Sequence, residues 1–264
     1  MYDKFPLSFI SEEDFIEHIK NTIKEYGDKL EPYDTVKFNK NIIDPIKLIF
    51  DKMVYQSSWE EIVKNEIFRQ RDKSNNNSIG YFHQKIFSYI KNCEVPDNGK
   101  QGGWDIIYHS NYDYTSPDGD KAKTIFVELK NKHNTMNKAA AKNTYMKCQN
   151  KLLYDDDCIC MLVETIAKHS QDIIWVNEGM KHRKIRRVSI DKFYALTTGV
   201  EDAFYQLCLV LPDAIEKVIS NAETPIPNDT AYTEIKNTAD AKKISMSMAF
   251  YLLGFKEYSG FVGL

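Results

Sequence analysis

The 264-residue sequence predicts an α/β fold in which a mixed sheet of about four or five strands is flanked by helices. Two short apolar runs, residues 104–108 and 124–130, are joined by a turn-rich segment and therefore predict a β-hairpin. The almost continuous apolar run 158–163 follows a helix-forming segment, which is typical of a buried strand that lies parallel to its neighbour. Helical periodicity before and after this region predicts helical N- and C-terminal extensions.

Four helices are expected before the first strand. Acidic residues in a first turn favour a helix start at Ser11, and Pro32 ends that segment. Apolar residues recur at helical spacing in the following segments, although Pro45 interrupts the second helix early and a polar stretch, residues 73–78, separates the third helix from the fourth. The expected helices cover residues 11–31, 39–53, 57–71 and 79–91.

Helices and short strands alternate after the hairpin. A helix is expected from about Met136 to Tyr154, and the polar residues just before it include good N-cap types. Two short apolar strands and two helices follow, and Pro212 is expected to break the first of these helices. The expected ranges are 173–176 and 188–190 for the strands and 203–220 and 239–253 for the helices, with a loop over 221–228.

Three charged residues stand out on the predicted hairpin: Asp105 in its first strand, and Glu128 and Lys130 in its second. Because side chains in a strand alternate between the two faces, Glu128 and Lys130 must share one face, and strand pairing can bring Asp105 beside Glu128. Two carboxylates and a lysine suit a divalent cation such as Mg²⁺ and a polarised water. An acid pair followed by lysine also occurs often by chance, in which case the acids merely pair with lysines.

The segments around these residues resemble the type II restriction endonucleases of the PD-(D/E)xK superfamily, in particular those that cut GGNCC or GGWCC sites. Three segments carry the resemblance, namely Gly80–Phe87, Gly103–Asp105 and Val127–Asn137. The resemblance is dense from about Ser78 to Lys151. One departure from the superfamily signature is that Trp104, rather than a proline, precedes Asp105.

The resemblance implies a PD-(D/E)xK core within a single nuclease domain over residues 1–264, and Mg²⁺-dependent hydrolysis of double-stranded DNA that leaves 5′-phosphate ends. Asp105 and Glu128, with the Leu129 carbonyl, would bind Mg²⁺, and Lys130 would orient or activate the attacking water. Gln84 is the candidate for a further polar residue in the site, with Glu66 a weaker one, although a surface glutamine is an equal alternative. The implied parts are a helical N-terminal extension over 1–77, a catalytic core with DNA-contacting elements over 78–190 and a helical C-terminal part over 191–264.

Basic residues gather in two acid-free stretches, residues 129–154 and 181–187, although the net charge is −3. This segregation fits one basic, DNA-facing surface on an otherwise acidic protein, whereas the alternative is two solvated stretches. A helix N-terminus can bind a phosphate, and arginine can read guanine through two hydrogen bonds. The candidate DNA-binding residues are Lys132, His133, Asn134, Thr135, Asn137, Lys138, Lys142, Arg183, Lys184, Arg186 and Arg187.

The expected partners follow from the substrate that the resemblance implies. A palindromic DNA site predicts a homodimer, because protein symmetry mirrors DNA symmetry. A companion DNA methyltransferase is implied by the family resemblance. The alternatives that stay open are a repair or recombination nuclease of the same superfamily and a non-catalytic DNA-binding protein.

Several other classes of protein find no support in the sequence. The five cysteines are odd in number and form no zinc or CxxC pattern, so reduced thiols in a cytoplasmic protein are expected. No apolar run has the length of a membrane span, and the N-terminus does not have the form of a signal peptide. Walker, GxGxxG and GxSxG motifs are not found.

Overall fold

The computed structural model divides the chain into two compact units. The first, which we call the sheet unit, contains residues 1–22 and 79–222, and the second, the helical unit, contains residues 23–78 and 223–264. The described residues are 5–27, 31–97, 100–220, 228–256 and 263. The loop predicted over residues 221–228 therefore lies outside the described residues except for its last position.

In the described part of the sheet unit, six strands form one mixed sheet in the order β1-β2-β3-β4-β6-β5. The pairs β1–β2, β2–β3 and β5–β6 are antiparallel, whereas β3–β4 and β4–β6 are parallel. The strands are β1 (Cys93–Glu94), β2 (Ile106–Tyr108), β3 (Thr124–Lys132), β4 (Cys158–Ile166), β5 (Asp172–Asn177) and β6 (Met180–Ser189). The α/β class is thus confirmed, and the expected four or five strands become six.

The two differences in the strands have simple causes. Strand β1 is only two residues long, too short to show an alternating pattern. Strand β6 includes the basic block 181–187, whose charged residues hide the strand pattern that was expected only at 188–190. The hairpin of β2 and β3 and the parallel pairing of β3 with β4 agree with the sequence prediction.

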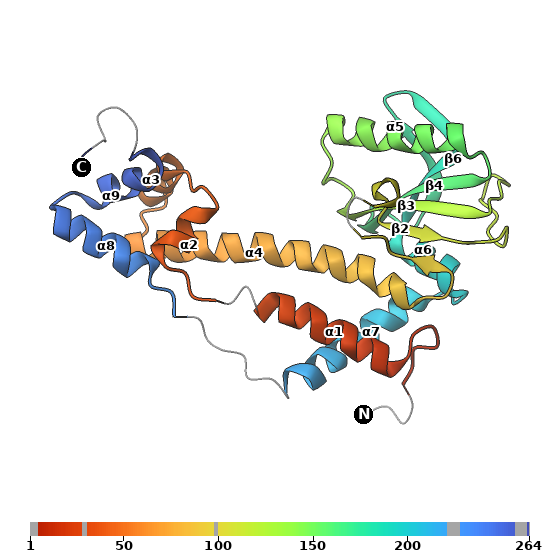
Figure 1. Cartoon of the computed structure of the whole chain (residues 1–264), viewed down its shortest axis with the longest axis horizontal. Coiled ribbons are helices and arrows are strands. Elements are labelled where there is room, and N and C mark those ends of the chain that lie inside the picture. Colours follow the sequence, from red (N-terminus) through yellow and green to blue (C-terminus); the bar gives the residue numbers. More distant parts are fainter. Residues whose placement is uncertain (1–4, 28–30, 98–99, 221–227, 257–262, 264) are drawn as a thin grey trace. The chain divides into compact units, whose positions relative to one another are not determined.

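Helix α5 (Lys138–Tyr154) makes the crossover from β3 to β4 and begins at Asn137, whose Oδ1 accepts a hydrogen bond from the Ala140 N–H at 2.8 Å. Figure 1 shows α5 along one side of the sheet and α6 (Ile190–Thr198) on the other. A buried cluster fills the α5 side and holds β2 and β3 in place. Its members are Trp104, Ile107, Phe126, Tyr145, Cys148, Cys158, Cys160, Leu162, Trp175 and Ile185.

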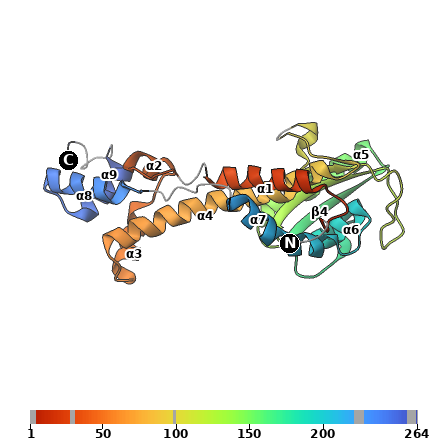
Figure 2. The same ribbon diagram turned by 90° about the horizontal axis from the view of Figure 1, so that it is seen from below.

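Two longer helices complete the sheet unit, α1 (Glu12–Gly27) and α7 (Ala203–Ile219), which lie side by side in Figure 2. Lys217 of α7 forms an ion pair with Glu12 of α1 at 2.8 Å. The expected break at Pro212 is wrong, because α7 continues through the proline. Buried residues on both sides of it, including Val210 and Ala214, keep the helix packed, so tertiary contacts offset the lost backbone hydrogen bond.

The helical unit has its own core, formed by residues of α2 (Thr35–Lys40), α3 (Pro45–Val54), α8 (Ala231–Lys242), α9 (Met246–Phe255) and the first part of α4 (Trp59–Lys85). The helix expected over 39–53 is two helices, because Asp44 caps a new helix that begins at Pro45. The helix expected over 239–253 is also two, because Lys243 takes a left-handed conformation at φ 55° and Ser245 caps α9.

Helix α4 runs without interruption through the polar stretch 73–78, so the predicted break there is wrong. The stretch holds no proline or glycine, and serine and asparagine each cost a helix less than about 0.7 kcal/mol. The Asn76 side chain donates a hydrogen bond to the Asp72 carbonyl one turn earlier, at 3.0 Å. The division between the two units falls inside this helix, and a short 3₁₀ helix, Ile86–Tyr89, follows it. No helix among the described residues is long and apolar enough to cross a membrane.

Candidate active site

The structure brings Asp105 and Glu128 together at the open end of the β2–β3 hairpin. Ile106 lies opposite Val127 in the antiparallel register, so Asp105, one residue earlier, is level with Glu128. The Asp105 N–H donates to the Val127 carbonyl at 3.0 Å, and the Leu129 N–H donates to Asp105 Oδ2 at 2.7 Å. These two bonds fix both the backbone and the carboxylate of Asp105 against β3.

Two lysine ammonium groups contact the Glu128 carboxylate. Lys130 follows Glu128 on the same face of β3, and its Nζ lies 3.3 Å from Glu128 Oε2. Lys147 reaches the other oxygen, Oε1, from α5. Its Nζ also donates to the Gly103 carbonyl at 2.7 Å and lies 4.1 Å from the centroid of the Trp104 ring.

Lys147 is a site residue that the sequence reasoning missed. It lies 17 positions after Lys130 in the acid-free stretch, where nothing distinguishes it from the other lysines of α5. A helical crossover after β3 has to pack back over the sheet, so one face of that helix must approach the β2–β3 pair. The rule predicts that a lysine on one face of α5 can reach the site, but it does not show that this lysine is Lys147.

The carboxylates sit in a partly desolvated, positively charged environment. The Glu128 side chain is only 12% exposed. Burial raises the pKa of Asp105 above its usual value, and the nearby Glu128 raises it further, whereas the Leu129 N–H, Lys130 and Lys147 oppose this shift. At neutral pH the formal charges of two carboxylates and two ammonium groups cancel.

The oxygen atoms of the site suit a hard divalent cation. Asp105 and Glu128 provide two adjacent carboxylates, and Mg²⁺ is usually held by one or two carboxylates together with waters and phosphate oxygens. The N–H and C=O of one residue in a strand point to the same side, so the Leu129 carbonyl faces the side on which its N–H binds Asp105. Among the described residues, no cluster of three or more histidine, cysteine or acidic side chains is placed to hold a metal.

Gln84, near the end of α4, contacts the site through its side chain. Its Nε2 donates to the Asp105 carbonyl at 3.1 Å, and the residue is 9% exposed. It therefore supports the backbone of Asp105 and is not a surface glutamine. Glu66, the weaker candidate, lies in the core of the helical unit, where it accepts hydrogen bonds from Arg69 and Gln70. Burial and, to a smaller extent, His18 lower the pKa of His83 to about 4.

The predicted DNA-contacting residues between β3 and α5 are mostly exposed. The segment is ordered by local contacts: the His133 N–H donates to the Ile166 carbonyl at 3.0 Å, and Thr135 Oγ1 donates to the Lys132 carbonyl at 2.9 Å. It leaves β3 two residues after Lys130, so it borders the acidic pair. The exposed side chains are Lys132, Asn134, Thr135, Asn137, Lys138 and Lys142, and His133 is half-buried.

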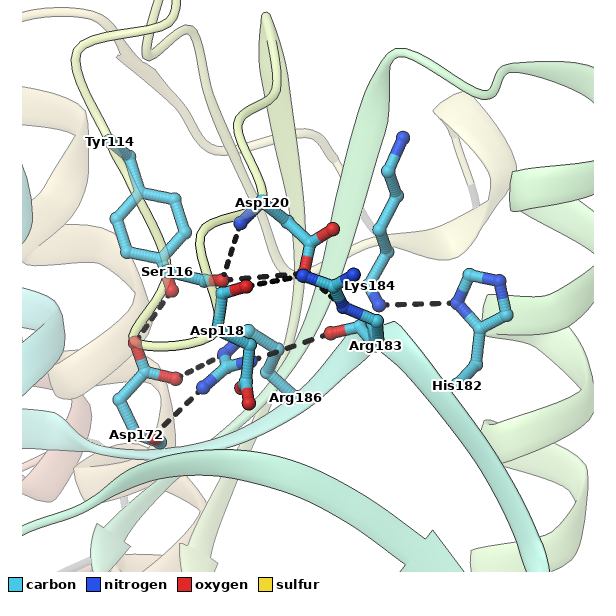
Figure 3. Close-up of polar contacts among 9 residues, drawn as sticks. All are labelled: Tyr114, Ser116, Asp118, Asp120, Asp172, His182, Arg183, Lys184 and Arg186. Atoms are coloured by element: carbon cyan, nitrogen blue, oxygen red, sulfur yellow. Dashed lines mark hydrogen bonds and ion pairs between the residues drawn. The ribbon is translucent and has the colours of Figure 1, made fainter.

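Arg186 of the basic block lies in the protein interior. It is fully buried, and its guanidinium donates to Asp118 at 2.7 Å and to both the carboxylate and the carbonyl of Asp172, as Figure 3 shows. Tyr114 donates to the same Asp172 carboxylate at 2.6 Å. The assignment of Arg186 to DNA contact is corrected, because this side chain ties the hairpin loop to β5 and β6 and does not reach the surface.

The other basic residues of β6 are more accessible. Arg183 is 61% exposed and pairs with Asp120 at 3.2 Å, and Lys184 donates to the Asp156 carbonyl. Arg187 forms two hydrogen bonds with the buried Glu164, at 2.6 and 2.9 Å, and a third with the His133 carbonyl at 3.1 Å. Arg187 therefore holds the segment after β3, while Arg183 remains the arginine of this block with most exposed surface.

Comparisons with known proteins show the family to which the chain belongs. Residues 7–220 match the family model described as Eco47II restriction endonuclease. The chain is 34% identical over 222 residues to the type II restriction enzyme Sau96I of Staphylococcus aureus, which covers 80% of each chain. It is 26% identical to the type II restriction enzyme Eco47II of Escherichia coli over 228 residues, and this alignment covers 81% of this chain and 88% of the other.

Proposed function

The chain belongs to the Eco47II restriction endonuclease family, and we propose that it is a type II site-specific deoxyribonuclease whose active site is a PD-(D/E)xK core that uses Mg²⁺. The observation that carries this proposal is the juxtaposition of Asp105 with Glu128 and Lys130 across one strand pair. An acid at the end of one strand, level with a Glu-x-Lys sequence on the next, is the arrangement that this chemistry requires.

Each residue has a role that follows from its contacts. Asp105, Glu128 and the Leu129 carbonyl would hold the cation, and a cation bound there would supply positive charge for a phosphoryl oxygen and lower the pKa of a bound water. Lys130 carries three N–H donors and no acceptor, so it orients the attacking water or stabilises the negative charge that develops on the phosphate. In-line attack on the phosphodiester leaves 5′-phosphate and 3′-hydroxyl ends. Gln84 keeps the Asp105 backbone in position.

DNA recognition is assigned to the exposed segment that borders this site and to Arg183, which lies at the loop end of the hairpin. The segment from Lys132 to Lys142 offers side chains and the N-terminus of α5 to phosphates. Arg183 is the candidate for reading guanine in a GGNCC- or GGWCC-like site, since its side chain is 61% exposed. A palindromic site of this kind implies a homodimer. A companion methyltransferase that protects the host DNA is expected from the family alone.

The first test is cleavage of an unmethylated plasmid by the purified protein with and without Mg²⁺, followed by sequencing of the cut ends. Discrete fragments that need Mg²⁺ and end within GGNCC-type sites are expected. Cleavage without a common short sequence would contradict the restriction function and indicate a structure-specific nuclease. No cleavage by a folded protein that binds the plasmid would contradict catalysis itself.

A second prediction concerns Lys138 and Lys142, which lie one turn apart on the exposed face of α5. If both contact phosphates, replacing both with alanine lowers the slope of log affinity against log salt by about 0.9 for each lysine. Sequence preference stays the same, because phosphate contacts carry no base information. Fluorescence anisotropy of a labelled duplex at several salt concentrations measures the slope. Lys217→Ala, on α7, is the matched control, and an unchanged slope in the double variant would rule out the contacts.

A further inference from the structure

We propose that Lys147 makes cation binding at the Asp105–Glu128 pair depend on bound DNA. In the absence of DNA its ammonium group takes the position of a cation at Glu128, and the scissile phosphate draws it away. This inference rests on the proposed function, because it needs a divalent cation at the two carboxylates. It adds a positioning residue from α5 that the three-residue signature of the hairpin does not contain.

The contacts of Lys147 are those of a bound cation. Its Nζ contacts Glu128 Oε1, donates to the Gly103 carbonyl at 2.7 Å and lies 4.1 Å from the centroid of the Trp104 ring. A carboxylate, a carbonyl dipole and the negative face of an aromatic ring all attract positive charge. Two of the three groups, Gly103 and Trp104, directly precede Asp105, so the ammonium lies between the strand of one carboxylate and the side chain of the other.

Both oxygens of Glu128 are engaged by lysine. Lys147 contacts Oε1 and Lys130 lies 3.3 Å from Oε2. A Mg²⁺ ion takes oxygen ligands at about 2.0–2.1 Å, so at Glu128 Oε1 it competes with the Lys147 ammonium group, which is also positively charged. The two carboxylates and two lysines are also neutral as a group, so the site has no excess negative charge to attract a divalent cation.

A DNA phosphate changes this balance in two ways. It adds one negative charge next to the carboxylates, and it gives the Lys147 ammonium another acceptor, one that frees Glu128. The Lys147 side chain is 28% exposed, so its end can turn toward a ligand at the surface. Cation binding and DNA binding then strengthen each other by the same factor, since such coupling is reciprocal. A nuclease with this property binds its cation tightly only after it has bound DNA.

The neighbouring Lys151 provides a matched control on the same helix. It lies one turn further along α5, and its Nζ is also 4.1 Å from an aromatic ring, that of Phe126. Its ion pair is with Asp155 at 3.2 Å and not with the catalytic carboxylates. Lys151→Met therefore removes a similar ammonium–ring contact without touching Glu128.

The test is a calorimetric titration of the full-length protein with Ca²⁺, which takes the same oxygen ligands, with and without a short duplex that contains the cleavage site. Gel analysis confirms that the duplex stays intact. Wild-type protein is expected to bind Ca²⁺ at least about fivefold more tightly when DNA is present, the lower end of typical coupling between sites. Lys147→Met raises the affinity in the absence of DNA by at least about fivefold and reduces the coupling, whereas Lys147→Arg and Lys151→Met behave like wild type.

The outcomes separate this inference from the proposed function. If wild type binds Ca²⁺ with DNA but Lys147→Met binds it without DNA no more tightly than wild type does, the inference is wrong and the cation site stands. If wild type binds Ca²⁺ in no state, or if Asp105→Asn binds it as tightly as wild type does, the cation site itself is wrong and the inference fails with it. Thermal melting of each variant shows that the comparison is made between folded proteins, and Lys147→Gln, which also removes the charge, is used if the methionine variant does not fold.

Discussion

Lys130→Met is expected to lower the rate of DNA cleavage by at least about 10²–10³-fold, the usual cost of removing one donor that stabilises a transition state. The physical reason is that methionine keeps the apolar stem of lysine but removes the ammonium group that lies 3.3 Å from Glu128 on the same face of β3. Folding and DNA binding should stay close to wild type, since the Lys130 ammonium is bonded to neither the core nor the exposed segment after β3. Single-turnover cleavage at saturating enzyme and Mg²⁺ measures the effect.

Lys132→Met is the control for this prediction. It removes the next lysine along the same face of β3, where the strand ends and the side chain is exposed. We expect it to weaken DNA binding, most strongly at low salt, while leaving the single-turnover rate at saturating enzyme unchanged. If Lys130→Met retained a rate within about fivefold of wild type, Lys130 would have no part in the transition state and the donor would have to be sought elsewhere, with Lys147 as the nearest alternative.

The hairpin could be predicted because its information is local. Ile125, Val127 and Leu129 alternate with Thr124, Phe126, Glu128 and Lys130, which fixes the face of Glu128, and the turn-rich link predicts that β2 and β3 pair as a hairpin. The cap at Asn137 and the helix after it can likewise be predicted from residues that are close together in the sequence. Asp105 and Glu128 are therefore placed together by rules that act over a few residues and one strand pairing.

The rest of the site depends on contacts between distant residues. Lys147 reaches Glu128 only because α5 packs over the sheet, and the composition of α5 does not show which lysine points inward. The same reason explains the error at Arg186, which looks like its neighbours in a basic block. On strand β6 alternate side chains face opposite ways, and Asp118 and Asp172 lie where Arg186 points. Helix α4 is a third example, because the weak helix formers in residues 73–78 predict a break that the structure does not contain.

Arg186→Met is expected to destabilise the sheet unit by about 3–5 kcal/mol, the range for removing one partner of a buried ion pair. Arg186 is 0% exposed and the Asp172 side chain is 15% exposed, so the variant leaves the Asp172 carboxylate buried with only the Tyr114 hydroxyl as a charge-stabilising partner. Urea denaturation followed by circular dichroism measures the loss. Arg183→Met is the matched control three residues away, and its exposed pair with Asp120 should contribute at most about 1 kcal/mol.

The double variant Arg186→Met/Asp172→Asn tests the cause. If the penalty comes from an uncompensated carboxylate, neutralising Asp172 recovers part of the loss, and the two effects are not additive, by about 0.5–3 kcal/mol. Two fully additive effects would show that packing and not charge is responsible.

The same proteins test whether the buried arginine has a role in DNA recognition. If Arg186 is structural, Arg186→Met leaves the sequence preference unchanged under conditions where the variant is folded. If Arg186 reads guanine, the substitution lowers the discrimination against a wrong base at one position by about 1–3 kcal/mol.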